Sequence, residues 1–493
     1  MVWIHGGGYG TGQGNNEFWE LLQTNDNGFV LVLIQYRLGA FGWLSSDDLV
    51  NNGGVPNAGL HDMHFALQWV KQHIGQFGGD SDHVTISGES AGAGAVMLLG
   101  MTNNGSEGTS LFTNSIAASP YLPTQWRYDG LAPTQAYDNF ATEVGCTDDS
   151  QNSSIFACLV GADTLTLQNA SAIISGSYKY GQWAFLPVTD TNFLSERPSV
   201  QLNAGQVNGL RLLTSNNADE GQGFVPQNIT SESDFNEYVE GLFPLMSRNN
   251  ITRILEAYSI ALVKPGPLFS TLGDSGPTAL NQSEFAIGQQ QRANNLYAET
   301  TFVCPSYWLA NGYMASKWPG KTGTSQKRAA WKYQFSVPPS EHGADLDAYQ
   351  AFNREALGEG TMTTAARLAI QLAWGRFIMY DNPTLPDSII LDLVTGTNGI
   401  STHDNITAIS SSNWPQWSSE PPLGQSLMLN VNMTGGMPHV ITWTPVGGTA
   451  INITQMTAPG LEAAFRIVDA NSWEAGRAQR CEVWRELGDV VPE

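Results

Sequence analysis

The stretch that decides the fold is Val84-Thr-Ile-Ser-Gly-Glu-Ser-Ala-Gly-Ala-Gly-Ala-Val-Met-Leu-Leu99. It begins as a β-branched run, turns through Gly88-Glu-Ser-Ala-Gly92, and continues as small and then apolar residues that predict a helix. A serine at such a strand-to-helix turn has a strained backbone and presents its hydroxyl above the sheet. Glycines are needed on both sides of it, because a side chain there would collide with the crossing strand and helix. The stretch therefore predicts Ser90 as a nucleophile.

A second glycine-rich segment lies near the start of the chain. Residues 1–4 are apolar and predict a short strand, and His5-Gly-Gly-Gly8 follows at once. Consecutive glycines let backbone N–H groups approach a ligand closely. A strand followed by such a loop is the second half of the oxyanion hole that a Gly-x-Ser-x-Gly turn requires.

Apolar strands alternate with helical patterns along the chain. We expect strands at 29–35, 115–118, 208–214 and 330–336, and helices at 60–74, within 281–316 and at 364–380. This alternation predicts an α/β fold with a large, mainly parallel central sheet flanked by helices. No internal repeat, low-complexity tract or clear linker interrupts the pattern, so we expect a single domain over residues 1–493.

A serine nucleophile needs a base to take its proton and a carboxylate to orient that base. In this type of fold the acid precedes the histidine along the chain. His342 follows a predicted strand in a loop rich in glycine and proline, which favours it as the base over His403 and His439. Asp219 and Glu220 both follow a predicted strand, and the residues alone leave both open as the acid.

Composition excludes several classes of protein. The 493 residues carry a formal net charge of −23, which argues against a nucleic-acid partner. No apolar run approaches the ~18 residues of a membrane span, so we expect no transmembrane segment.

His61 and His64 have a spacing that permits a metal pair, but a third ligand is not evident. We expect no metal and no cofactor.

Cysteines and sequons indicate the secretory pathway. The 4 cysteines allow two disulfides in one of three pairings. Candidate glycosylation sites are Asn104, Asn152, Asn169, Asn228, Asn250, Asn281, Asn405, Asn432 and Asn452. No signal peptide precedes Met1-Val-Trp-Ile. We expect a secreted glycoprotein whose sequence is truncated at its N-terminus.

Several ordered motifs together resemble the type-B carboxylesterase/lipase family, which includes cholinesterases and secreted fungal lipases. The motifs are Tyr36-Arg-Leu-Gly-Ala-Phe-Gly-Trp-Leu44, Asn57-Ala-Gly-Leu-His-Asp62, Ala66-Leu-Gln-Trp-Val70, Phe77-Gly-Gly-Asp80 and Gly88-Glu-Ser-Ala-Gly92. Later matches are sparser and include Phe185-Leu-Pro-Val-Thr-Asp190, Ala218-Asp-Glu-Gly221, His342-Gly-Ala-Asp-Leu346 and Asn413-Trp-Pro-Gln-Trp417. The resemblance implies an α/β-hydrolase fold. Because the HGGG loop follows the third strand of that fold, it also implies that the N-terminal strands and any lid lie upstream of residue 1.

The resemblance also implies roles for individual residues. It makes Glu220 the acid, His342 the base, and the N–H groups of Gly7, Gly8 and Ala91 the oxyanion donors. Supporting roles fall to Glu89 beside the histidine, Ser119 as a hydrogen-bond partner of the acid, and Trp183 and Phe185 in an acyl pocket. The implied disulfides are Cys146–Cys158 and Cys304–Cys481.

The implied activity is hydrolysis of small-molecule or lipid carboxylic esters through an acyl-enzyme. One alternative is a triacylglycerol lipase of the same family, since the lid region that would distinguish the two lies upstream of residue 1. A second alternative is a non-catalytic, cholinesterase-like adhesion or structural protein, although such relatives lack the serine.

Overall fold

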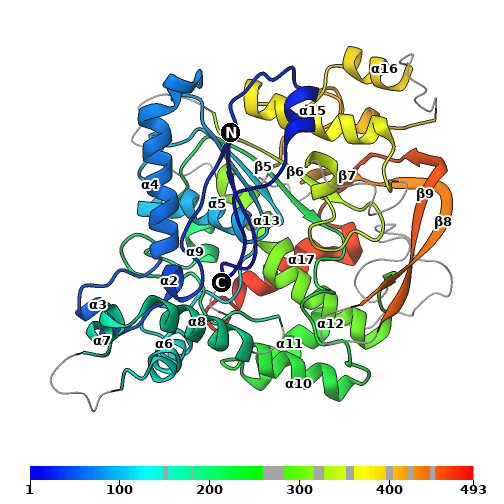
Figure 1. Ribbon diagram of the computed structural model, residues 1–493. Helices are drawn as coiled ribbons and strands as arrows, with labels where there is room; N and C mark the ends of the chain where they lie inside the picture. The colour runs from blue at the N-terminus through cyan, green and yellow to red at the C-terminus, as the bar shows by residue number, and fades with distance from the viewer. Residues whose placement is uncertain are drawn as a thin grey trace.

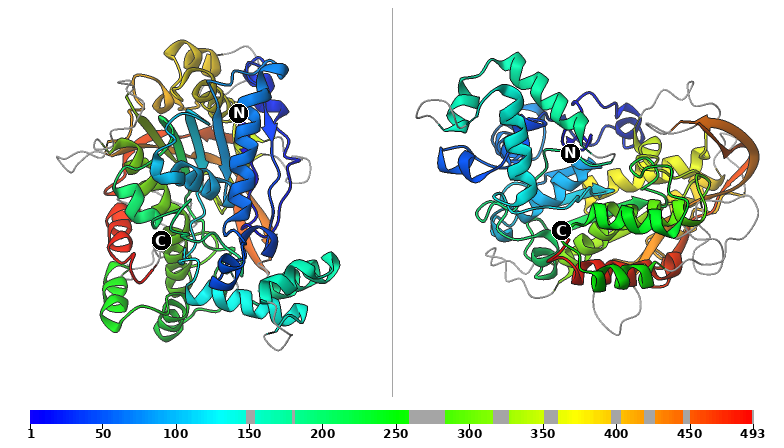
Figure 2. Two further views of the ribbon diagram at one scale, coloured as in Figure 1. Left: turned by 90° about the vertical axis from the view of Figure 1, so that its left-hand side faces the viewer. Right: turned by 90° about the horizontal axis from the view of Figure 1, so that it is seen from below.

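The computed structural model describes residues 1–147, 154–178, 181–258, 283–315, 327–350, 360–395, 403–418, 426–444 and 450–491. Its centre is an eight-stranded sheet in the order β10-β7-β6-β5-β4-β3-β1-β2 (Figure 1). Neighbouring strands from β2 to β7 run parallel, and β10 pairs antiparallel with β7. Helices flank the sheet (Figure 2). The expected fold class is therefore confirmed.

The strands of the described chain are β1 Val2–Ile4, β2 Val32–Leu33, β3 Thr85–Glu89, β4 Asn114–Ala118, β5 Arg211–Asn217, β6 Ala329–Phe335, β7 Leu427–Val431, β8 Met433–Trp443, β9 Ile451–Ala463 and β10 Arg466–Asp469. The helices in the first half are α1 Trp19–Thr24, α2 Ala40–Trp43, α3 Asp47–Asn51, α4 Ala58–His73, α5 Ala91–Met101, α6 Leu131–Val144, α7 Ile155–Gly161, α8 Thr164–Ser177, α9 Pro198–Asn203 and α10 Glu232–Leu242. Those in the second half are α11 Arg248–Ala257, α12 Gly288–Ala298, the π-helical turn η3 Glu299–Val303, α13 Cys304–Met314, α14 Leu346–Tyr349, α15 Thr364–Tyr380, α16 Asp387–Thr395 and α17 Trp473–Glu486.

The apolar core has two parts, one on each face of the sheet. Successive side chains of a strand point to opposite faces, and in β4 Ala117 belongs to one cluster while Ile116 and Ala118 belong to the other. Helices α4, α5, α13 and α17 pack into the first cluster, and α1, α15 and α16 into the second. Both faces of the sheet are therefore buried, which explains the continuous apolar runs of its strands.

Element bounds differ from the sequence expectations in places. The apolar run 29–35 forms only the two-residue strand β2, which lies at an edge of the sheet and has β1 as its one strand partner among the described residues. The strand expected at 208–214 begins at Arg211 and continues to Asn217, because β6 pairs with it along its whole length. The long hairpin β8–β9, which stands to one side of the sheet in Figure 1, was not predicted.

Both expected disulfides are present, Cys146–Cys158 and Cys304–Cys481. The second joins the start of α13 to α17, residues that are 177 positions apart. In the parts of the chain described, no helix combines the length and the apolar character that crossing a membrane would need.

Candidate active site

Ser90 lies between β3 and α5 in the conformation that its glycine neighbours predict. Its φ of 58° and ψ of −127° are in a region that L-residues rarely occupy, at a cost of order 1–3 kcal/mol. A Cβ on Gly92 would lie 2.0 Å from the carbonyl oxygen of Ile4, and one on Gly88 would lie 2.4 Å from the carbonyl carbon of Gly92. The N–H of Ser90 donates to Ala118 O at 3.1 Å. Close packing of β1, β3 and α5 thus holds the strained turn.

His342 and Glu220 reach Ser90 from two neighbouring strands. His342 follows β6, and Glu220 follows β5. The Nε2 of His342 is 2.8 Å from Ser90 Oγ, and its Nδ1 is 2.5 Å from Glu220 Oε2. All three residues lie at the carboxyl ends of parallel strands, which meet at the same edge of the sheet. The chain therefore brings a hydroxyl, an imidazole and a carboxylate into a linear series of contacts.

The structure separates the two acid candidates. Glu220 is fully buried, and its Oε1 accepts from Ser119 Oγ at 2.6 Å and from the backbone N–H of Asn217 at 2.5 Å. The side chain of Asp219 accepts from Gln291 at 3.1 Å, and burial raises its pKa to about 6. Glu220 is thus the carboxylate in contact with the imidazole, and Ser119 contacts it.

A second carboxyl group, that of Glu89, lies on the other side of the imidazole and changes the electrostatics of the site. Glu89 Oε1 is 3.3 Å from His342 Nε2. Burial alone lowers the pKa of His342, but the carboxylates of Glu89 and Glu220 outweigh it and raise that pKa to about 9. Burial raises the pKa of Glu89 to about 8, even though His342 opposes the shift. The two groups titrate as a coupled pair.

The glycine loop after β1 turns back on itself beside Ser90. The N–H groups of Gly10 and Thr11 donate to Gly7 O at 3.1 and 3.0 Å, and Tyr36 donates its hydroxyl to His5 O at 2.8 Å. Gly7 and Gly8 have φ values of 107° and 59°, which favour glycine. Within the described residues, the N–H groups of Gly7, Gly8 and Ala91 are not used in hydrogen bonds to other protein groups.

An aromatic pocket lies next to this loop. The indole of Trp183 packs so closely that a Cβ on Gly8 would lie 2.1 Å from it. The cavity behind it has a volume of about 190 Å³, and its aromatic lining includes Trp43, Tyr121, Trp126, Trp183, Phe185 and Tyr297. The N–H of Tyr121 donates to Ser90 O at 3.1 Å, which connects the pocket wall with the serine turn. Apolar pockets of this kind are typical of ligand sites.

Sequence reasoning missed several residues around the imidazole. The ring centroids of Phe302 and Phe224 lie 4.2 and 5.1 Å from that of His342. Asn217 Nδ2 donates to Ser119 Oγ and to Asp345 Oδ1, each at 3.2 Å. Phe302 and Phe224 lie on segments with no motif, so no pattern in the sequence could have found them. Asp345 belongs to the His342-Gly-Ala-Asp-Leu346 motif, and this motif was the sequence signal that could have identified it.

The candidate glycosylation sites differ in how exposed they are. The sequon asparagines Asn104, Asn169, Asn228, Asn405 and Asn452 are exposed, and Asn250 is partly exposed. Asn432 is buried, with its Oδ1 accepting the N–H of Met433 at 2.8 Å. Asn152 and Asn281 lie outside the described residues.

The two neighbouring histidines of α4 have protein partners. His64 Nε2 is 2.7 Å from Glu107 Oε1, and His61 stacks on Phe193 with ring centroids 4.1 Å apart. A search of the described residues finds no group of three or more His, Cys, Asp and Glu side chains that could hold a metal ion.

The parallel sheet and the strained serine turn define an α/β-hydrolase fold. The sequence profile of the Carboxylesterase family matches residues 1–423, and the chain belongs to that family. It is 29% identical over 365 residues to Carboxylesterase patB of Aspergillus clavatus, covering 73% of this chain and 58% of that protein. Secreted lipase 4 of Gibberella zeae is 28% identical, over 67% of this chain and 59% of its own. The matched part is thus less than two thirds of the length of these relatives. The crystal structure of Aspergillus niger EstA superposes with a TM-score of 0.69 at 22% identity, covering 100% of this chain and 81% of that one.

Proposed function

We propose that this protein hydrolyses carboxylic esters through an acyl-enzyme, with Ser90 as nucleophile, His342 as general base and Glu220 as the acid that orients it. The observation that carries the proposal is the series of contacts from Ser90 Oγ to His342 at 2.8 Å and from His342 to Glu220 at 2.5 Å. Such a series activates a hydroxyl that is otherwise a weak nucleophile. Membership of the Carboxylesterase family supports the same chemistry.

The proposed reaction proceeds in two halves. Ser90 Oγ attacks the ester carbonyl carbon while His342 Nε2 takes the hydroxyl proton, and Glu220 stabilises the imidazolium that forms. The tetrahedral intermediate collapses as the C–O bond to the alcohol breaks, and His342 returns the proton to the leaving alkoxide. A water then attacks the acyl-enzyme with His342 again as base, which releases the carboxylic acid and restores Ser90.

Two features of the site support specific binding roles. The N–H groups of Gly7, Gly8 and Ala91 would bind the oxyanion, and removal of one such donor typically costs 10²–10³-fold in rate. The cavity lined by Trp183 and Phe185 would take the acyl or the alcohol part of the ester, since Trp183 packs against Gly8 and the N–H of Tyr121, another lining residue, binds Ser90 O. We propose no cofactor, because every step is a proton or acyl transfer between protein, substrate and water.

A triacylglycerol lipase is the second candidate. The similarity to Secreted lipase 4 favours it as much as the similarity to Carboxylesterase patB favours an esterase. The presence of Ser90 in contact with an imidazole is an argument against a non-catalytic adhesion protein.

A series of p-nitrophenyl esters with acyl chains of increasing length distinguishes the two enzymes. We expect hydrolysis of the short esters in solution, with a preferred length set by the volume of the cavity beside Trp183. Rates are measured below and above the solubility of each ester. A sharp rise in rate when the substrate forms an aggregate would identify a lipase, and no hydrolysis of any member would contradict the proposed function.

Glu89 is expected to set the pH dependence. His342 must be neutral to accept a proton, so activity rises with pH as the imidazole loses its own proton. Because the pKa of His342 is raised to about 9, this rise should lie well above the ordinary histidine pKa of about 6.5. Replacement Glu89→Gln removes the ionisable carboxyl group 3.3 Å away, which raises the pKa of His342, and should move the midpoint of kcat/KM against pH to a lower value.

The control for this experiment is Glu107→Gln. It removes one carboxylate beside a different histidine, His64, and so changes the net charge equally. Its midpoint should equal that of the wild type. An unchanged midpoint in Glu89→Gln would show that Glu89 does not act on His342.

We also propose that the protein is secreted and glycosylated. Two disulfides are typical of extracellular proteins, and one relative is named a secreted lipase. The exposed sequons, such as Asn169 and Asn228, are the favoured acceptors, whereas the buried Asn432 is a poor one.

A further inference from the structure

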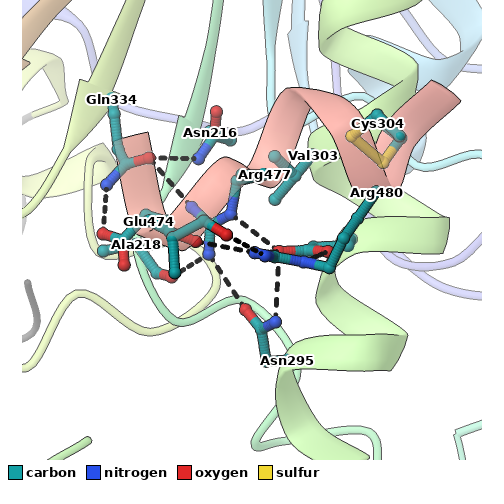
Figure 3. A network of polar contacts seen from close by, with 12 residues as sticks. Asn216, Ala218, Asn295, Val303, Cys304, Gln334, Glu474, Arg477 and Arg480 are labelled. Atoms are coloured by element: carbon teal, nitrogen blue, oxygen red, sulfur yellow. Dashed lines mark hydrogen bonds and ion pairs between the residues drawn. A yellow bond between two sulfur atoms is a disulfide. The ribbon is translucent and has the colours of Figure 1, made fainter. Parts of the chain in front are cut away.

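A buried cluster of charged and amide side chains lies behind the acid residue. Arg477 and Arg480 of α17 and Glu299 of η3 are at most 4% exposed. Glu299 accepts from Arg477 Nε at 3.0 Å and from Arg480 Nη2 at 2.7 Å (Figure 3). Charges with so little access to water are stable only when they are paired and hydrogen-bonded. We call this set, together with Gln334 and Asn295, the arginine cluster.

The two arginines have different partners. Arg480 also donates from Nε to Glu299 Oε2 at 2.8 Å, and it donates from Nη1 to Ala475 O and from Nη2 to Glu474 O, within its own helix. Arg477 reaches away from α17 towards the ends of the strands. It donates from Nη1 to Gln334 Oε1 at 2.9 Å, and from Nη2 to Asn295 Oδ1 at 3.0 Å and to Ala218 O at 3.3 Å (Figure 3).

The carbonyl of Ala218 belongs to the turn that presents Glu220. The other backbone groups of this turn are held by neighbouring strands and loops. Ala218 N donates to Phe335 O at 2.9 Å, Asp219 N donates to Ser340 O at 3.0 Å, and Asn217 O accepts from Asn216 Nδ2 at 2.8 Å. The N–H of Asn217 binds the carboxylate of Glu220 itself. Arg477 is thus the one cationic side chain, among the described residues, that is seen to bind the backbone of this turn.

The same guanidinium is connected to the turn by a second route. Gln334 of β6 accepts from Arg477 and also from Asn216 Nδ2 at 3.3 Å. Asn216 is the residue whose side chain holds the carbonyl of Asn217. Displacement of the guanidinium would therefore move both the carbonyl of Ala218 and the amide that fixes Asn217.

We infer that Arg477 is a positioning residue for the carboxylate of Glu220, holding the turn 217–220 so that Oε2 stays in contact with His342 Nδ1. Arg477 lies outside residues 1–423, the part of the chain that the family profile matches. Helix α17 lies beside α11 and α13 (Figure 2) and is joined to the start of α13 by Cys304–Cys481, which keeps the guanidinium in place. The inference rests on the proposed roles of Glu220 and His342.

The test compares Arg477→Lys with Arg480→Lys. Both variants keep the positive charge, lose the planar fork of donors, and weaken the same partner, Glu299. Both should therefore lower the melting temperature. Only Arg477→Lys releases the acid turn. We expect its kcat for a p-nitrophenyl ester to fall about 10- to 100-fold with little change in KM, because a small misplacement of a reacting group has effects of this size. Arg480→Lys should stay within about threefold of the wild type.

The pKa of His342, followed by NMR of ¹³C-labelled histidine with His342→Gln for assignment, gives a readout that does not need activity. A weaker contact with Glu220 should lower that pKa in Arg477→Lys and leave it unchanged in Arg480→Lys. A wild-type protein without esterase activity would overturn the proposed function, and the titration would still test the inference. Equal kcat and equal pKa in the two lysine variants would overturn the inference.

A second pair covers the case in which Arg477→Lys does not fold. Gln334→Met removes the acceptor of Arg477 Nη1 and keeps every charge, and Gln371→Met changes a buried glutamine of α15 that binds Thr24. We expect the first to lower kcat and the pKa of His342 and the second to change neither. Equal behaviour of these two variants would likewise overturn the inference.

Discussion

Replacement of Ser90 by alanine should lower ester turnover by about 10⁶-fold, the loss seen when a serine hydrolase of another fold loses its nucleophile. Without Oγ, His342 Nε2 has no hydroxyl to activate at 2.8 Å. The fold should be kept, because the strained turn is held by the backbone packing of Gly88 and Gly92 and not by the hydroxyl. The measurement is kcat for a soluble p-nitrophenyl ester, with circular dichroism to compare the melting temperatures.

Ser87→Ala is the matched control for this variant. Ser87 lies in β3, three residues before Ser90, and donates its hydroxyl to Val2 O at 2.9 Å. Its loss should lower stability but leave turnover near that of the wild type. An organophosphate should label the wild type and Ser87→Ala at Ser90, and should not label Ser90→Ala. Turnover within tenfold of wild type in Ser90→Ala would contradict the assignment of the nucleophile.

The second large effect is expected from Glu220→Gln. The amide N–H of the glutamine can donate to His342 Nδ1, and the imidazole proton would then lie on Nε2. A protonated Nε2 cannot accept the proton of Ser90. A comparable change in a serine protease triad lowers kcat about 10⁴-fold, and we expect a loss of this order. The measurement is kcat with KM determined separately, so that loss of substrate binding is not mistaken for loss of catalysis.

Asp219→Asn is the matched comparison, because Asp219 is adjacent, equally buried and also a carboxylate. Its side chain accepts from Gln291 and has no contact with the imidazole among the described hydrogen bonds, and burial raises its pKa, so its charge is less favoured than that of an exposed carboxylate. We expect turnover within about tenfold of the wild type. If Asp219→Asn were the more damaging variant, the assignment of the acid to Glu220 would be wrong.

Local chemistry in the sequence was sufficient to predict the turn at Ser90 and the parallel sheet. Gly88 and Gly92 indicate tight packing at the turn, since a Cβ on Gly88 would meet Gly92 and one on Gly92 would meet Ile4 of β1. The alternation of strands and helices indicates burial on both faces of the sheet. The predicted helix at 364–380 agrees with α15, because the spacing of apolar residues within the segment itself predicts the helix.

Residues that act through tertiary contacts could not be predicted in this way. Which of Asp219 and Glu220 contacts His342 depends on the pairing of β5 with β6. This pairing extends β5 to the polar residues Asn216 and Asn217. Asparagines are unfavourable in buried strands. Here they are tolerated because the Asn216 amide binds Lys332 and Gln334 and the Asn217 amide donates to Glu220. The role that we infer for Arg477 depends on a helix more than a hundred residues after Glu220.

The spacing of the site along the chain has a consequence for how the protein folds. Ser90 and His342 are 252 positions apart, and His342 and Glu220 are 122 apart. Closing such long loops costs entropy before any contact compensates for it, and parallel strands form slowly for this reason. We therefore expect the site to be assembled late in folding. Until strands β3 to β6 have paired, their apolar edges are open, and we expect folding intermediates to be prone to aggregation.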